Sequence, residues 1–237
     1  NGYKVSDFET AIRKTTKVIY IETPSNPLLT ITDISGVAKL AKSHGIVSMI
    51  DNTFASPINQ NPADFGIDLI MHSATKYLGG HSDILAGAVA GSAEHVERIW
   101  NVAKNLGGSL SDMTVWLLER SMKTLSLRVK AQNANAQKLA EYLLGLVEVA
   151  SVYYPGLESH PEHELARTQM KGYGGMLSFE LVEGINAIAF QNKLELIKSS
   201  MSLAGVESTM LLPSVTSHAL LTQEQRDNIG IKEGLIR

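Results

Sequence analysis

Two short apolar runs with a helical pattern between them, all within residues 17–51, decide the fold. The runs are Lys17-Val18-Ile19-Tyr20-Ile21-Glu22 and Ile46-Val47-Ser48-Met49-Ile50-Asp51. Both are short and apolar on both faces, which predicts buried strands. Between them, Asp33 suits the N-cap of a helix through about Ser43, and Gly45 stands where a helix commonly ends in glycine. Strand, helix and strand in this order are typical of a parallel sheet.

The same alternation continues along the first half of the chain. We expect further strands at residues 68–71 and 86–90, and a helix over about 93–103. Residues 113–146 are helical in pattern and contain no proline, which is long for one helix, so we expect a break near Thr124-Leu125. The sequence therefore predicts an α/β protein with a mostly parallel sheet covered by helices.

The second half of the chain has a different pattern. Strands are expected at residues 149–154 and 176–181, with a loop at 172–175 and a helical pattern over 186–196. We therefore expect a smaller α+β C-terminal domain, and a boundary near residue 125 that divides the chain into residues 1–125 and 126–237.

Composition excludes several classes of protein. The 237 residues include no cysteine, which rules out disulfides, thiolate zinc sites and a cysteine nucleophile and fits a reducing compartment such as the cytoplasm. The formal charge of −3 argues against a nucleic-acid partner, and no apolar run approaches the ~20 residues that a membrane span needs. The chain begins at Asn1 without a signal-peptide pattern and ends abruptly, so we expect both ends to be cut from a longer chain.

Polar side chains follow the expected strands of the first half, where open α/β sheets bind their ligands. Asn26 follows the first strand, Asp51 the second, and Ser73, Thr75 and Lys76 the third. The two hydroxyls, with their backbone N–H groups, would suit a phosphate. An amine of lowered pKa is a nucleophile, and a buried carboxylate could hold a cationic ring nitrogen. Together these are the requirements of pyridoxal phosphate (PLP).

Each of these residues has an ordinary interpretation when it is taken alone. A lysine after a strand is usually a solvated surface residue, an aspartate there is often a helix N-cap, and Ser73 and Thr75 could cap a turn. The combination in this order favours the cofactor site.

Longer motifs continue this pattern through the chain. They are Glu22-Thr23-Pro24-Ser25-Asn26-Pro27, Asp51-Asn52-Thr53-Phe54-Ala55, His72-Ser73-Ala74-Thr75-Lys76-Tyr77-Leu78-Gly79-Gly80-His81-Ser82-Asp83, Lys123-Thr124-Leu125 with Arg128, Tyr154-Pro155-Gly156-Leu157, Gly174-Gly175-Met176, Ser202-Leu203 with Glu207-Ser208, and Gly234-Leu235-Ile236-Arg237. In these motifs the chain resembles the Cys/Met-metabolism PLP-dependent enzymes, which include cystathionine γ-synthase, cystathionine γ- and β-lyases, methionine γ-lyase and O-acylhomoserine sulfhydrylases.

The resemblance implies a PLP-dependent transferase of fold type I and a role for each residue near the cofactor. Lys76 would hold PLP covalently and then take the α-proton of the substrate. Asp51 would pair with the ring nitrogen, and Ser73 and Thr75 would bind the phosphate. Asn26 would lie near the phenolic oxygen of the cofactor and near the substrate carboxylate.

The resemblance also implies the substrate and the assembly. Arg237 would bind the α-carboxylate of a sulfur amino acid, with Ser202 near it. Family members are homotetramers with active sites shared between subunits. The family's N-terminal portion has no counterpart here, and it carries the glycine-led phosphate loop, the tyrosine that stacks on the ring, and a tyrosine and an arginine lent to the neighbouring subunit.

Several alternatives stay open within and outside this family. Ser202-Leu203 resembles the γ-enzymes, so we favour cystathionine γ-lyase or γ-synthase chemistry over methionine γ-lyase, cystathionine β-lyase or O-acylhomoserine sulfhydrylase. Outside the class stands a noncatalytic PLP-fold interaction module, supported only by the missing N-terminal portion.

Other kinds of site have little support in the sequence. His160, Glu162, His163 and Glu164 crowd together, but Pro161 breaks any helix that would align them, so we expect no metal site. The nucleophile elbow, Walker A and dinucleotide fingerprints do not occur.

Overall fold

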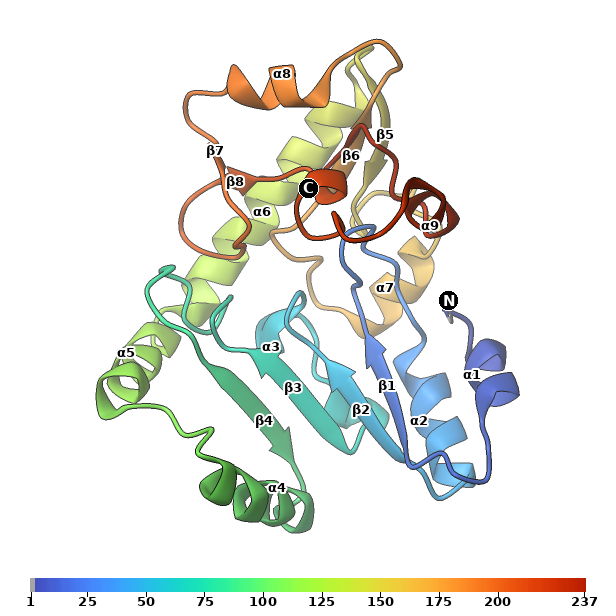
Figure 1. Ribbon diagram of the computed structural model, residues 1–237, viewed down its shortest axis with the longest axis vertical. Coiled ribbons are helices and arrows are strands. Elements are labelled where there is room, and N and C mark those ends of the chain that lie inside the picture. The colour runs from blue at the N-terminus through green and yellow to red at the C-terminus, as the bar shows by residue number, and fades with distance from the viewer. Residues whose placement is uncertain (1–2) are drawn as a thin grey trace.

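The computed structural model describes residues 3–237, and Asn1 lies outside this range. Its first half contains a four-stranded sheet in the order β1 (Val18–Glu22), β2 (Val47–Asp51), β3 (Leu69–Ser73) and β4 (Gly87–Gly91). The first three strands are parallel, and β4 is antiparallel to β3. The expected α/β class with a mostly parallel sheet is therefore confirmed, with one antiparallel edge strand (Figure 1).

One face of this sheet packs on α2 (Ile34–Ser43) to form the first core. The helix begins as predicted, because an Asp33 side-chain oxygen accepts a hydrogen bond from the Gly36 N–H at 2.9 Å. Gly45 follows the helix with a φ of +64°, which glycine adopts without strain. Short helices α1 (Val5–Ala11) and η1 (Pro62–Phe65) contribute Val5, Phe8 and Phe65 to the edge of the same core.

The opposite face of the sheet differs from the prediction. The outward side chains Val18, Tyr20 and Val89 are exposed, so β1 alternates between buried and exposed residues although its sequence is apolar on both faces. The next helix, α4 (Ala93–Leu106), has no buried residue. The two tryptophans of the chain lie on α4 and on the helix that follows it. Trp100 on α4 is 58% exposed, and Trp116 on the next helix is 56% exposed.

The break expected near Thr124-Leu125 is confirmed. Helix α5 (Asp112–Met122) ends, and α6 (Leu125–Leu144) begins after a two-residue junction at Lys123 and Thr124. Figure 1 shows α6 running from the four-stranded sheet toward the three-stranded sheet of the second half.

The second half contains an antiparallel sheet in the order β5 (Val149–Tyr153), β6 (Ser178–Leu181) and β9 (Leu235–Ile236). Its core includes Leu143, Phe179, Met210, Leu212 and Ile236. The remaining short elements are α3 (Ser56–Asn59), α7 (His163–Gln169), α8 (Ala187–Asn192), β7 (Lys198–Ser199), β8 (Thr209–Met210), η2 (Pro213–Val215) and α9 (Gln223–Asn228). Helix α8 is four residues shorter at its end than its sequence pattern predicts.

Within residues 3–237, none of the helices combines the length and the apolar character that a membrane crossing requires.

The first core can be tested at Ile50, which is fully buried in β2 beside α2. Because Ile50→Ala deletes buried methyl groups and leaves a cavity, we expect the free energy of unfolding to fall by about 2–5 kcal/mol. Denaturant unfolding of the complete protein measures this change. Val147→Ala, at an exposed position between α6 and β5, is the matched control and should change the free energy by less than about 0.5 kcal/mol.

Candidate active site

Parallel pairing brings the ends of three strands to one edge of the sheet. Glu22 of β1 lies in register with Asp51 of β2, which in turn lies opposite Met71 of β3. Residues paired in this way point to the same face, so the two carboxylates are neighbours. Asp51 is held in place because one carboxylate oxygen accepts a hydrogen bond from the Thr53 N–H at 2.9 Å, and Tyr20 donates its phenol to the other at 3.4 Å.

Lys76 lies in a tight turn that follows β3. Its N–H donates to the Ser73 carbonyl at 3.0 Å, and its own carbonyl accepts from the Gly80 N–H at 2.6 Å. Strand β3 extends through His72 and Ser73, two residues beyond the predicted end, because both residues pair with β4. The turn therefore begins directly at the carboxyl edge of the sheet, where the sequence places it.

The expected phosphate donors are partly occupied by the protein itself. The backbone N–H of Ser73 donates to the Thr53 hydroxyl at 2.8 Å, and that of Thr75 donates to the Ala86 carbonyl at 3.1 Å. The Thr75 hydroxyl also accepts from the Ala86 N–H at 2.9 Å. The Thr75 hydroxyl in turn donates to the Ala86 carbonyl at 3.3 Å. The two backbone N–H groups and the Thr75 hydroxyl would therefore have to exchange these partners to contact an anion, and the role of Ser73 and Thr75 in binding phosphate stays a prediction.

The buried guanidinium of Arg237 contacts residues from two distant segments of the chain. The residue is 8% exposed, and it donates from Nη1 to the Asn26 side-chain oxygen at 3.0 Å and from Nη2 to the Met201 carbonyl at 3.3 Å. Ser202 follows Met201 in the chain. Among the described residues, the buried Nε of Arg237 has no hydrogen-bond partner. The structure thus leaves one donor of a buried cation free for an anionic group.

Electrostatics link this arginine to Lys76. Burial and the positive charge of Arg237 lower the pKa of Lys76, and burial lowers the pKa of Arg237 to about 10. A lysine with a lowered pKa carries more of the neutral, nucleophilic amine near neutral pH. Arg237 therefore relates the other two residues, because it donates a hydrogen bond to Asn26 and its charge acts on the Lys76 amine.

Glu22 and Tyr20 were not expected to contribute to the site. Partial burial of the carboxyl and the charge of Asp51 raise the pKa of Glu22 to about 7, although the residue stays open to solvent. Burial and Asp51 together raise the pKa of Tyr20 to about 12. The signal in the sequence is their spacing, because residues two apart on a strand share a face.

One further contact connects the segment after Lys76 to the second half of the chain, because the Ser82 hydroxyl donates to a Glu207 carboxylate oxygen at 3.1 Å. The loop that carries Glu207 is itself held on α6, where the Gln132 side chain donates to the Gly205 carbonyl at 2.8 Å. The sequence motifs included Glu207 but did not indicate that Ser82 would be its partner, because a contact between residues 125 apart leaves no local sequence pattern.

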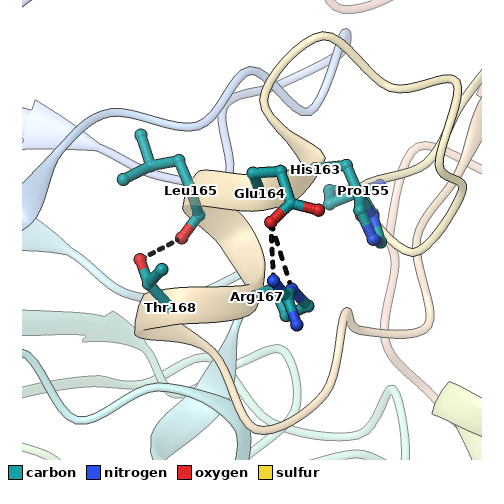
Figure 2. A network of polar contacts seen from close by, with 6 residues as sticks. All are labelled: Pro155, His163, Glu164, Leu165, Arg167 and Thr168. Carbon is teal, nitrogen blue, oxygen red and sulfur yellow. Dashed lines mark hydrogen bonds and ion pairs between the residues drawn. The ribbon is translucent and has the colours of Figure 1, made fainter.

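The crowded histidine and glutamate segment is occupied by other interactions (Figure 2). The ring of His163 is turned toward Pro155, with Nδ1 2.8 Å from the Pro155 carbonyl, and Glu164 pairs with Arg167 at 2.7 Å. Burial lowers the pKa of His160 to about 4. In the part of the chain that the structure describes, no group of histidine, cysteine, aspartate or glutamate side chains is arranged to hold a metal ion.

The chemistry of this donor set fits PLP and an amino-acid substrate. An amine of lowered pKa, a carboxylate held by a backbone N–H, two hydroxyls and a buried guanidinium with a free donor lie at or near the same edge of the sheet. PLP needs a lysine, a partner for its ring nitrogen and a phosphate site, and an amino acid adds a carboxylate.

Comparison with known proteins gives a consistent family match. The family model described as Cys/Met metabolism PLP-dependent enzyme matches residues 1–237. The chain is 47% identical to a cystathionine β-lyase of Lactococcus lactis subsp. cremoris (strain MG1363) over 234 residues, which are 98% of this chain and 62% of that protein. It therefore spans less than two thirds of that relative's length.

Two solved structures are similar in fold. The crystal structure of cystathionine γ-lyase from Lactobacillus plantarum complexed with L-serine has a TM-score of 0.96 and 44% identity, over 99% of this chain and 62% of that one. Cystathionine γ-synthase from Xanthomonas oryzae pv. oryzae, in complex with aminoacrylate and cysteine, has a TM-score of 0.92 and 43% identity, over 98% and 60% of the two chains.

The carboxylate pair predicts a pH-dependent stability. Because the folded protein raises the pKa of Glu22, the stabilising contribution of its bound proton is complete below about pH 4.5 and is lost as the pH rises to about 7. Relative to Glu22→Gln, the free energy of unfolding of the unchanged protein should therefore fall across this window. Denaturant unfolding of the complete protein at several pH values measures the difference, and Glu9→Gln on α1 is the control for the loss of an exposed carboxylate. Parallel pH profiles for the protein and Glu22→Gln would contradict the prediction.

The link between Arg237 and Lys76 predicts a charge-dependent pKa. Arg237→Gln removes the positive charge, so the pKa of Lys76 should rise, whereas Arg237→Lys keeps the charge and should keep the pKa closer to its original value. The pH dependence of labelling of Lys76 by an amine reagent, followed by peptide mass spectrometry on cofactor-free complete protein, measures this pKa. Equal pH midpoints for the two variants would show that the charge has no effect.

Proposed function

The chain belongs to the Cys/Met metabolism PLP-dependent enzyme family, and from this premise we propose that the complete protein eliminates or replaces a group at the β or γ carbon of a sulfur amino acid. One observation carries the proposal. Arg237 is a buried cation whose Nε has no hydrogen-bond partner among residues 3–237, it contacts Asn26, and its charge lowers the pKa of Lys76. A carboxylate site next to an activated amine suits an amino-acid substrate of a PLP enzyme.

Four residues of the first half would hold the cofactor together with Asn26. Lys76 would bind it covalently, Asp51 would hold the ring nitrogen in its protonated state, and the Ser73 and Thr75 hydroxyls would contact the phosphate. Thr75 would have to exchange its hydrogen bonds with Ala86 to do so. When bound, PLP supplies an electron sink for the charge that develops at the α carbon of the substrate.

The substrate carboxylate would lie on Arg237. Nη1 already donates to Asn26, so Nε and Nη2 form the edge that can donate to the two oxygens of a carboxylate. Nη2 would then exchange its 3.3 Å contact with the Met201 carbonyl for the ligand. Ser202, which follows Met201, would border the same site.

Lys76 would act as the general base that takes the α-proton of the substrate. A base works best when its pKa lies near the working pH, and both burial and Arg237 move the pKa of Lys76 in that direction. The same arginine would thus bind the substrate and favour the neutral form of the base.

Among the reactions of the family, we favour cystathionine γ-lyase or γ-synthase chemistry, because Ser202-Leu203 resembles those enzymes. The named relatives divide among a β-lyase, a γ-lyase and a γ-synthase, so methionine γ-lyase, cystathionine β-lyase and sulfhydrylase reactions are the alternatives that the product analysis must separate.

We also propose fold type I and a homotetramer with shared active sites, as the family resemblance implies, and a cytoplasmic location, which the absence of cysteine fits. The division into residues 1–125 and 126–237 is part of the same proposal. It is supported by the helix break at Lys123 and Thr124 and by the separate sheets on either side of it.

Product analysis of the complete protein tests the proposed function. Cystathionine alone should give cysteine and 2-oxobutanoate if the protein is a γ-lyase, and an O-acylhomoserine with cysteine should give cystathionine if it is a γ-synthase. Homocysteine and pyruvate from cystathionine would instead identify a β-lyase. Lys76→Ala should lower kcat by about 10²–10⁴-fold, the usual contribution of a general base, while the exposed Lys39→Ala should not.

Borohydride reduction provides a second measurement. In the active protein it should attach a pyridoxyl group to Lys76, which peptide mass spectrometry detects. A complete protein that is colourless after incubation with PLP and removal of the unbound cofactor, and that carries no such group, would reject the enzyme and favour a noncatalytic interaction module.

A further inference from the structure

The guanidinium of Arg128, in the first turn of α6, contacts the turn that carries Lys76. Nη1 donates to the Tyr77 carbonyl at 2.9 Å, and Nη2 lies 3.5 Å from the Leu78 carbonyl. These two carbonyls belong to the residues that directly follow Lys76. One planar cation therefore reaches two successive peptide groups of the turn.

The same guanidinium is anchored at the junction between α5 and α6. Nη2 donates to the Ser121 carbonyl at 3.0 Å, and Nε donates to the Thr124 hydroxyl at 3.0 Å. All three guanidinium nitrogens are therefore in use. Because Ser121 and Thr124 stand where one helix ends and the next begins, Arg128 connects that junction to the turn after Lys76.

Gly80 completes the contact on the other side of the turn. It has a φ of +67°, its N–H closes the turn on the Lys76 carbonyl, and a Cβ at this position would overlap the guanidinium. Two separate constraints therefore require glycine at position 80. One is the backbone conformation with positive φ, and the other is the close approach of the Arg128 guanidinium.

Tyr77 fixes the turn from a second direction. Its phenol is buried and accepts a hydrogen bond from the Gly175 N–H at 2.7 Å, while its carbonyl is held by Arg128. With the next residue held at both its backbone and its side chain, Lys76 has little freedom to rotate about the turn.

We propose that Arg128 is a positioning residue for Lys76, whose planar fork holds the turn 76–80 against the α5–α6 junction and so sets the direction of the amine. This inference rests on the proposed function of Lys76. Lysine cannot replace Arg128 in this role, because an ammonium is a single point of charge and cannot serve several carbonyls in one plane.

The variant Arg128→Lys separates positioning from charge, because it keeps the positive charge and loses the fork. A misdirected Lys76 amine would lose part of its burial, which is the main cause of its lowered pKa, so that pKa should rise. In the complete holoenzyme, kcat should fall about 10–100-fold with KM within about twofold, because small misplacements of a reacting group are costly.

The first readout is the pH midpoint of Lys76 labelling in cofactor-free complete protein, measured by peptide mass spectrometry, and the second is kcat with KM. Arg226→Lys is the matched control, since Arg226 also donates to a backbone carbonyl, that of Leu221, and contacts no residue of the turn. It should leave both readouts unchanged.

Thr124→Val supplies a second test that does not depend on the folding of Arg128→Lys. It removes the acceptor of Arg128 Nε and should move both readouts in the same direction by a smaller amount. If either folded variant has the original labelling midpoint and kcat and only unfolds at a lower temperature, Arg128 has a structural role alone and the proposal is overturned.

The labelling readout also separates this proposal from the proposed function. A complete protein without activity or bound cofactor would reject the function, while a raised Lys76 midpoint in Arg128→Lys would still support the positioning of the amine by Arg128.

Discussion

Parallel pairing of β1, β2 and β3 is the constraint on which the site depends. Because the three strands run in the same direction, their carboxyl ends meet at one edge, and the register that opposes Glu22 to Asp51 places two carboxylates side by side. The Lys76 turn starts where β3 ends. A slip of one residue in the register would turn Asp51 to the opposite face of the sheet and separate it from the turn.

The site is completed by the second half of the chain through a buried cation. Arg237 follows β9, yet its guanidinium contacts Asn26 beyond β1 and lowers the pKa of Lys76. Burial of a charge is costly unless hydrogen-bond partners surround it. Asn26 and Met201 supply two acceptors, while Nε has none within the described part of the chain. The two halves therefore share a polar centre that neither could form alone.

Local pattern predicted much of the fold. The apolar runs and caps located β1, α2 and β2, and the length of the helical stretch predicted the break before Leu125. Two features were not predictable from local pattern. The exposure of Val18 and Tyr20 depends on which helices pack on which face, and the antiparallel direction of β4 depends on how the chain returns to the sheet.

The sequence predicted which residues at the strand ends form the candidate site, but it did not predict the tertiary contacts that these residues make. Strand-end polar residues and the family motifs pointed to Asn26, Asp51 and Lys76, and the structure relates Asn26 and Lys76 through Arg237. The occupied N–H groups of Ser73 and Thr75 could not be foreseen, because they depend on partners up to 20 residues away. The proposed roles themselves stay predictions.

The exposure of α4 and α5 has an optical consequence. The two indole rings of the chain stand on these helices, remote in sequence from the core residues around Ile50 and Phe179. Indole emission responds to the polarity of its surroundings, and both rings are more than half exposed, so the intrinsic fluorescence of this chain reports mainly on the solvent around α4 and α5.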